Sequence, residues 1–262
     1  MTGGLAGRSI LITRPAGQAE RVAARVRAAG GEAIVYPAIE IAPPENPHAL
    51  GSILDRLDGF QIAIFISPTA VAKGHAAVVA RRAWPIGMRL AAVGEGTAAA
   101  LAALGFEGVI APVGRGDSEA LAAMAELSDV RGKSIVIFRG EGGRESLRRA
   151  LEARGASVEY AECYRRVRPR ADPAALIARW AHSGVHAVSI TSTEGLENLI
   201  AILGEQGAAH LRATPVFVPH PRVAEAARLS GVRETVLVDP GDDALVQALA
   251  SFFATVRSAP EH

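Results

Sequence analysis

The chain has 262 residues, of which 49 % are apolar, and its formal net charge is +1. This near-neutral charge argues against a general nucleic-acid-binding surface. Apolar runs stay well short of the roughly 20 residues that a membrane span requires, and the first nine residues do not resemble a signal peptide. The single cysteine, Cys163, excludes an intrachain disulfide and a cysteine-based metal cluster. We therefore expect a soluble, cytoplasmic protein with a sizeable core, without a membrane or nucleic-acid partner.

Short apolar segments alternate with helical patterns along the chain. Strands are expected at 9–13, 33–36, 61–66, 89–93, 108–111, 134–138, 157–161, 186–190, 215–218 and 235–238. These segments are rich in Ile, Val and Ala and are mostly continuous, which is typical of parallel strands buried on both faces. Helical patterns at 17–29 and 143–154 are followed by Gly30 and Gly155, where a glycine that ends a helix belongs. The alternation predicts an α/β fold with parallel sheets.

The chain also contains an internal repeat. Residues 8–36 and 133–161 carry the same strand–turn–helix–glycine–strand unit and align without a gap. Further matches join 59–71 to 184–196 and, after a one-residue slip, 96–106 to 222–232. A duplicated α/β unit predicts two similar lobes of about five strands each, in a flavodoxin-like order. We expect the lobes to face each other, with a ligand cleft between them.

Two proline-bearing stretches interrupt this pattern at equivalent positions of the repeat, 36–47 and 164–173. Proline disfavours helix at these positions and favours an extended linker. The residues leave two arrangements open. The lobes could be tandem halves of about 1–128 and 129–262, or the stretches could be crossovers that let the two chain ends form one lobe.

Five segments, taken in chain order, resemble the uroporphyrinogen-III synthase family, and the resemblance covers nearly the whole chain: 10–30, 64–71, 91–101, 136–166 and 190–199. The most specific part is RGEGGRESL at 139–147, followed by YRR at 164–166. The resemblance implies two flavodoxin-like lobes joined by a two-stranded linker. When the family's lobes are carried over to this chain, lobe one is 1–36 with 172–262. Lobe two is 37–171, which includes linker stretches at about 37–47 and 164–171.

The activity that the resemblance implies is cyclisation of the linear tetrapyrrole hydroxymethylbilane to uroporphyrinogen III, with loss of water and inversion of ring D, in tetrapyrrole biosynthesis. The pyrrole nitrogens can expel the hydroxyl group themselves, so the enzyme's principal task is to orient the chain for ring closure through a spiro intermediate. The resemblance implies no metal and no organic cofactor. We expect a monomer that acts on this small molecule and could contact the preceding hydroxymethylbilane synthase transiently.

Tyr164 is the candidate catalytic residue. It matches the tyrosine that the family is proposed to use to protonate the departing hydroxyl, and its counterpart in the repeat is Ile39. Because the substrate's cation forms readily, even a weak acid such as a phenol can protonate the departing hydroxyl. The alternative is a tyrosine that only packs the linker against a lobe.

The candidate substrate-binding residues follow the carboxyl ends of the expected strands. Free N–H groups at helix starts attract anions, and arginine can bind the substrate's carboxylates in a bidentate manner. These residues are Thr13, Arg14, Ser67, Thr69, Gly94, Thr97, Arg139, Arg144, Thr191, Ser192 and His220. Each Ser or Thr could instead be an ordinary N-cap. His220, between two prolines, could be a substrate contact, a second proton donor or a surface residue.

Two other functions remain as alternatives. The segment GEGTAA at 94–99 fits G-x-G-x-x-A and would suggest a dinucleotide-binding oxidoreductase, but the next expected strand lacks the acidic residue at its end. The second alternative is a two-lobed binding or sensor protein that closes on a polycarboxylate ligand without turnover.

Overall fold

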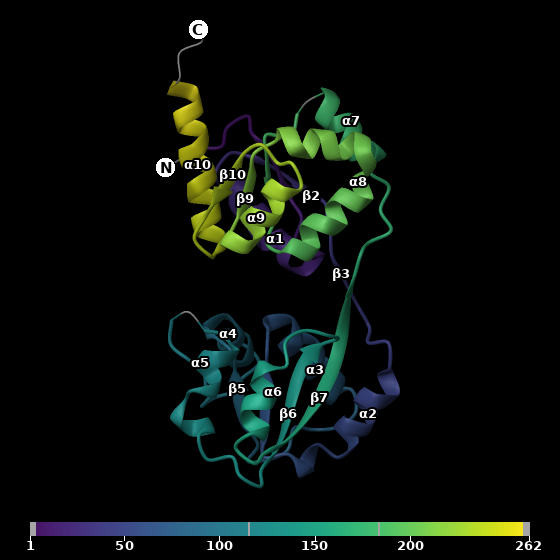
Figure 1. Cartoon of the computed structure of the whole chain (residues 1–262), viewed down its shortest axis with the longest axis vertical. Coiled ribbons are helices and arrows are strands. Elements are labelled where there is room, and N and C mark those ends of the chain that lie inside the picture. The colour runs from purple at the N-terminus through teal and green to yellow at the C-terminus, as the bar shows by residue number, and fades with distance from the viewer. Residues whose placement is uncertain (1–3, 115, 183, 259–262) are drawn as a thin grey trace. The chain divides into compact units, whose positions relative to one another are not determined.

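The computed structural model describes residues 4–114, 116–182 and 184–258, and Figure 1 shows their course. By its internal contacts the chain divides into two compact units, unit 1 (1–40 and 167–262) and unit 2 (41–166). Residues 37–40 and 167–171, which the resemblance places in lobe two, thus fall in unit 1. For the first of these stretches the reason is local packing, because Ala38 is buried in the core of unit 1 and its N–H donates to the Thr13 carbonyl at 2.9 Å.

The sheet of unit 1 has the strand order β10-β9-β8-β1-β2. These strands are β10 (Thr235–Leu237), β9 (Val216–Val218), β8 (Ala187–Ser189), β1 (Ser9–Ile12) and β2 (Glu32–Val35). All four pairings are parallel. Numbered along the unit, the order is that of a flavodoxin-like sheet, so this part of the expected fold is confirmed.

The sheet of unit 2 has the order β3-β7-β6-β4-β5. These strands are β3 (Glu40–Ala42), β7 (Ser157–Val167), β6 (Ser134–Gly140), β4 (Ile62–Phe65) and β5 (Arg89–Ala92). The pairs of β4 with β5 and β6, and of β6 with β7, are parallel. In the order of the repeat, β6 and β7 correspond to β1 and β2, and β4 and β5 to β8 and β9, so both units share one topology.

Two strand predictions for unit 2 were wrong in detail, and one strand was not predicted. The segment 108–111 forms only one parallel bridge, between Ile110 and Ala91, at the place that β10 holds in unit 1. The edge strand β3 was not predicted, because it is short and lies among prolines, which sheets accept at their edges. Strand β7 runs to Val167 rather than ending at 161, and its last residues are mostly polar and carry no continuous apolar pattern.

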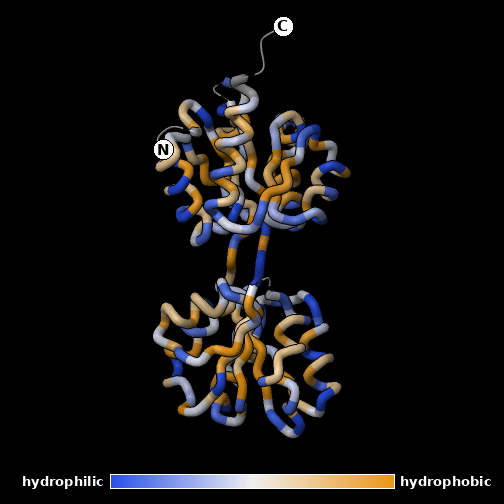
Figure 2. Tube along the Cα trace, turned by 90° about the vertical axis from the view of Figure 1, so that its left-hand side faces the viewer, coloured by the Kyte–Doolittle hydropathy of each residue, from blue (hydrophilic) through white to orange (hydrophobic). Residues whose placement is uncertain are grey.

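Helices cover both faces of the sheet in unit 1. One face carries α1 (Ala16–Ala28) and α10 (Asp242–Ser258), and the other carries α7 (Ala174–His182), α8 (Thr193–Ala213) and α9 (Pro221–Leu229). Consecutive residues of a strand point to opposite faces. Ile10 and Ile12 accordingly pack with α1 and α10, whereas Leu11 packs with the other three helices. Figure 2 shows the strands of each unit as mostly apolar, with polar residues on the surrounding helices and turns.

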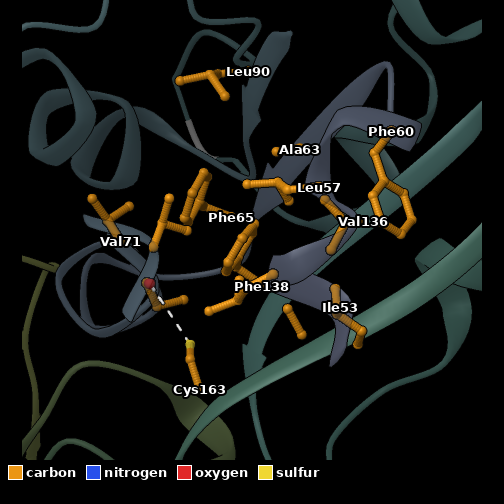
Figure 3. Close-up of a cluster of buried hydrophobic side chains, with 14 of the residues drawn as sticks. Ile53, Leu57, Phe60, Ala63, Phe65, Val71, Leu90, Val136, Phe138 and Cys163 are labelled. Carbon is orange, nitrogen blue, oxygen red and sulfur yellow. Dashed lines mark hydrogen bonds between the residues drawn. The ribbon is translucent and has the colours of Figure 1, made fainter. Parts of the chain in front are cut away.

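Unit 2 has the same three layers. Helices α2 (Pro47–Asp55), α3 (Pro68–Val79) and α4 (Glu95–Ala102) cover one face, and the short α5 (Ser118–Ala122) and α6 (Ser146–Glu152) cover the other. Two 3-10 turns, Leu57–Gly59 and Ala125–Leu127, complete the unit. The core beneath α3 is built around Phe65 and Phe138, whose rings stack with their centroids 4.7 Å apart (Figure 3).

Helices α1 and α6 end in the same way, as the glycine pattern predicted. Gly30 has φ 85° and donates to the Arg27 carbonyl, and the next N–H, of Gly31, donates to Val26. At the end of α6, Gly155, also with φ 85°, donates to the Glu152 carbonyl, and the N–H of Ala156 donates to Leu151. This is the Schellman arrangement, which needs a left-handed residue that glycine adopts without strain. None of the described helices combines the length and apolarity that crossing a membrane requires.

Candidate functional site

The candidate residues lie at the carboxyl-terminal edge of the sheet in their own unit. In unit 1, Thr13 and Arg14 follow β1, Thr191 and Ser192 follow β8, and His220 follows β9. In unit 2, Ser67 and Thr69 follow β4, Gly94 and Thr97 follow β5, Arg139 ends β6 and Arg144 comes soon after it. Tyr164 pairs with Gly140 in the sheet, so it reaches the same edge. Ligands of open α/β sheets bind at this edge, where the strand order reverses.

Tyr164 contacts a second hydroxyl at this edge. Its Oη lies 3.2 Å from Ser67 Oγ, with either atom able to donate, and its side chain is buried. Ser67 Oγ also accepts a hydrogen bond from the Ala70 N–H at 3.0 Å and so caps α3. When Ser67 donates to Tyr164, the phenol keeps its own proton for a ligand. Tyr164 can therefore deliver one proton, and Ser67 can then donate a hydrogen bond to the phenolate that remains.

A β-bulge directs Tyr164 to this position. The register between β6 and β7 shifts after Arg139, which pairs with Glu162, whereas Gly140 pairs with Tyr164. The extra residue, Cys163, lets two successive side chains pack into the same core, an effect that bulges commonly have. Gly140 is essential to the arrangement, because a Cβ there would lie 2.7 Å from two ring carbons of Tyr164. Sequence reasoning does not find this bulge, because it depends on the partner strand.

The surroundings of Cys163 do not activate its thiol. Its thiol lies 3.2 Å from the Arg139 carbonyl, and burial raises its pKa to about 12. A thiol with such a pKa stays protonated and unreactive near neutral pH. Cys163 is therefore a small core residue. Among the residues that the structure describes, no three His, Cys, Asp or Glu side chains gather as a metal site would require.

Several candidates also serve the fold. Thr13 is buried and donates to the Ser189 carbonyl at 2.8 Å, joining β1 to β8. Ser192 Oγ accepts from the Gly195 N–H and caps α8, and the exposed His220 accepts through Nδ1 from the Arg222 N–H and caps α9. N-capping is thus a demonstrated role of Ser67, Ser192 and His220, and any contact with a ligand would come in addition to it.

The turn after β5 offers no dinucleotide fingerprint beyond its glycines. Gly94 precedes α4 with extended backbone that any residue adopts, and Thr97 is buried in the first turn of the helix. Glu95 accepts from the Gly114 N–H at 2.8 Å, which ties α4 to the following loop. Gly116 packs so closely that a Cβ there would lie 2.3 Å from the Val93 carbonyl oxygen. The glycines thus permit close packing of two loops.

The buried Arg139 forms a cluster with two partly exposed residues that were not predicted from the sequence. Its Nη1 donates to Glu145 Oε1 at 3.2 Å, and its guanidinium lies over the Tyr160 ring, 4.3 Å from the centroid. Tyr160 Oη donates to Glu145 Oε2 at 2.9 Å. This hydrogen bond, reinforced by Arg139, lowers the pKa of Glu145, while burial and the bond to Glu145 raise the pKa of Tyr160 to about 12. The phenol therefore keeps its proton, and Arg139 is held in one orientation.

In unit 1 the equivalent arginine, Arg14, is held by a different carboxylate. Its Nη1 lies 2.6 Å from Asp242 Oδ1, and Arg21 Nε lies 2.6 Å from Asp242 Oδ2. Asp242 is the first residue of α10 and is buried. Burial alone would raise its pKa, but the two arginines outweigh this effect and lower the pKa. Asp242 was not selected from the sequence, although the repeat offers a signal, since Asp117 stands before α5 in the matching place.

We expect Asp242→Asn to lower the free energy of unfolding at neutral pH and to flatten its dependence on pH below about 4. The folded pKa of Asp242 is lower than the unfolded value of 3.8. The ionised group therefore contributes stability above that value, and the contribution is lost as the pH falls through the folded pKa. Urea unfolding at several pH values should show the difference between wild type and variant shrinking below pH about 4. Asp243→Asn, at an exposed neighbour, is the control, and an equal effect of both variants would contradict the assignment.

Comparison with known proteins assigns the family. The family model of uroporphyrinogen-III synthase HemD matches residues 20–247. The chain is 36 % identical to the uroporphyrinogen-III synthase of Salmonella typhimurium and 34 % identical to that of Escherichia coli, in each case over 92 % of this chain and 99 % of the relative. Neither the dinucleotide-binding nor the binding-protein alternative is favoured by these matches.

Two solved structures support the fold. A mutant uroporphyrinogen III synthase from the extremely thermophilic bacterium Thermus thermophilus has a TM-score of 0.61 at 19 % identity and covers 96 % of this chain and 100 % of its own. Uroporphyrinogen-III synthetase from Helicobacter pylori has a TM-score of 0.58 at 15 % identity, with 94 % and 99 % covered. With the extent of the family match and the identity to the two curated relatives, the resemblance seen in the sequence is confirmed: the chain belongs to the uroporphyrinogen-III synthase family.

Proposed function

We propose that the protein is a uroporphyrinogen-III synthase, which cyclises hydroxymethylbilane to uroporphyrinogen III with loss of water and inversion of ring D. The observation that carries this proposal is the identity of 36 % to a curated enzyme of that name over nearly the full length of both chains. The geometry at the sheet edge of unit 2 supplies a proton donor that suits the first step.

Tyr164 is the proposed general acid. The carbon–oxygen bond of the substrate's hydroxymethyl group breaks as a pyrrole nitrogen pushes electrons toward it, and the phenol gives its proton to the departing oxygen, which leaves as water. The proton that the pyrrole system loses after ring closure restores the phenol. Ser67, 3.2 Å away, stabilises the transient phenolate by donating to it.

Orientation of the substrate is the second task. The cation that forms is flexible, and closing the ring at the substituted carbon requires the two chain ends to be held close together. Such positioning can lower a barrier by up to roughly 7–11 kcal/mol. Arg14 in unit 1 and Arg139 in unit 2 are the proposed anchors for substrate carboxylates, since both are charged, largely buried and fixed by carboxylate partners. The remaining proposed contacts are Thr13, Thr69, Gly94, Thr97, Arg144, Thr191, Ser192 and His220.

The decisive measurement is the identity of the product. The protein is incubated with hydroxymethylbilane, the product is oxidised, and isomers I and III are separated by chromatography. We expect mainly isomer III, whereas spontaneous closure in a sample without protein gives isomer I. Formation of isomer I alone, at the rate of the blank, would contradict the proposal, and tight binding without turnover would favour a polycarboxylate-binding protein.

A further inference from the structure

Unit 2 contains a pocket of about 280 Å³ at the carboxyl-terminal edge of its sheet. Ile66 and Val93 follow β4 and β5, Ile137 belongs to β6, and Leu147 comes from α6, and together they form its apolar wall. These side chains are fixed by the sheet and by a helix packed on it. The pocket is therefore preformed and can take a flat apolar group.

Three charged side chains, one hydroxyl side chain and one aromatic ring complete the lining: Asp117, Arg139, Arg144, Ser118 and Tyr160. Arg139 is buried and held by Glu145 and Tyr160, as described above, whereas Arg144 is exposed. Asp117 accepts from the Ala120 N–H at 2.8 Å through Oδ1, so its second oxygen can accept another bond. The pocket thus offers two arginine donors for carboxylates, a carboxylate acceptor for an N–H group, a serine hydroxyl and an aromatic ring.

The corresponding arginine of unit 1 has a different carboxylate partner. There Arg14, the repeat equivalent of Arg139, forms an ion pair with Asp242, which stands at the start of α10 as Asp117 stands at the start of α5. In unit 2, Arg139 instead pairs with Glu145, and Asp117 lines the pocket. The duplicated scaffold has therefore kept the arginine and the aspartate in both copies but joins them in only one. In unit 2 both side chains line the pocket instead, so both can contact a ligand there.

We propose that this pocket binds one pyrrole ring of the substrate together with its carboxyalkyl arms. This inference rests on the proposed function and names the part of the substrate that unit 2 receives. The ring lies along the apolar wall, and its N–H donates to Asp117. A carboxylate arm accepts from Arg139, and Arg144 receives a second arm at the pocket mouth. Glu145 and Tyr160 are positioning residues, because they hold the Arg139 guanidinium in place.

Enzyme kinetics with hydroxymethylbilane test the pocket. Arg144→Gln and Asp117→Asn should each raise KM by about tenfold, the size expected for one lost hydrogen bond to a charged group, with kcat changed less than KM. Arg139→Gln should have a larger effect. Because Arg139→Gln removes the charged partner of Glu145, the thermal unfolding midpoint of this variant must be measured too. The exposed Arg144 provides the variant that cannot disturb the core. Tyr160→Phe should raise KM less, since it removes only the bond to Glu145.

A matched control and a small probe complete the experiment. Arg56→Gln breaks an exposed ion pair with Glu159 elsewhere in unit 2 and should leave KM unchanged. A monopyrrole with one carboxymethyl and one carboxyethyl group should inhibit the wild type competitively, and about tenfold more weakly in Arg144→Gln and Asp117→Asn. Wild-type KM in both variants would overturn the inference. If the wild type forms no isomer III, the proposed function fails, and calorimetric binding of the monopyrrole to wild type and variants still decides about the pocket.

Discussion

Phe138→Ala is expected to lower the free energy of unfolding by about 3–5 kcal/mol. The Phe138 side chain is fully buried, stacks on Phe65 and lies 5.8 Å from the ring of Trp84 between centroids. Figure 3 shows it in the middle of the cluster beneath α3, so its removal leaves a cavity that the surrounding strands cannot close. Urea unfolding followed by circular dichroism and tryptophan fluorescence measures the change.

A second substitution makes this test specific. A Cβ on Gly74 of α3 would lie 2.6 Å from a ring carbon of Phe138. Gly74→Ala should therefore destabilise the wild type by overpacking but cost much less in the Phe138→Ala background, where the methyl group finds space. Ile86→Ala, at a fully exposed side chain, should change the free energy by no more than about 0.5 kcal/mol. Additive effects of Gly74→Ala and Phe138→Ala would contradict the packing described.

Tyr164→Phe is expected to lower kcat by roughly 10–100-fold, the low end of general-acid effects. The substitution removes the proton donor and the contact with Ser67 but keeps the ring that packs against Gly140. The thermal unfolding midpoint should therefore change little. Turnover of hydroxymethylbilane to isomer III, measured at saturating substrate, gives the result.

Tyr36→Phe is the matched control, because it removes a phenolic hydroxyl in unit 1 that is buried and makes no hydrogen bond within the described residues. It should retain the wild-type kcat. Should Tyr164→Phe also retain the full rate, the proton comes from water or His220, and the assignment of Tyr164 as the acid is wrong.

Features that depend on neighbours along the chain were predictable from the sequence. Continuous apolar segments indicated parallel strands, and Gly30 and Gly155 indicated the helix ends, because a left-handed backbone at these positions favours glycine. The gapless repeat indicated that both units share one topology, which the strand orders confirm. The resemblance of the whole pattern to one family indicated the class of enzyme.

Features that depend on a partner strand or helix were not predictable. Whether 108–111 becomes a strand is decided by pairing with β5, which gives only the bridge at Ile110. Strand β3 forms because the edge of β7 is there to receive it, and propensity alone does not favour three residues between prolines.

The sequence by itself therefore determined the fold class, the duplication, the family and the edge of each sheet where polar side chains gather. Only the tertiary structure decided what those side chains do. It shows that a bulge turns Tyr164 toward Ser67, and that Arg139 pairs with Glu145 whereas Arg14 pairs with Asp242. Both halves carry an arginine at the same position of the repeat and an aspartate at the start of a helix, α5 or α10. Which carboxylate an arginine contacts depends on side-chain packing between elements distant in sequence, and strand and helix periodicity do not encode that choice.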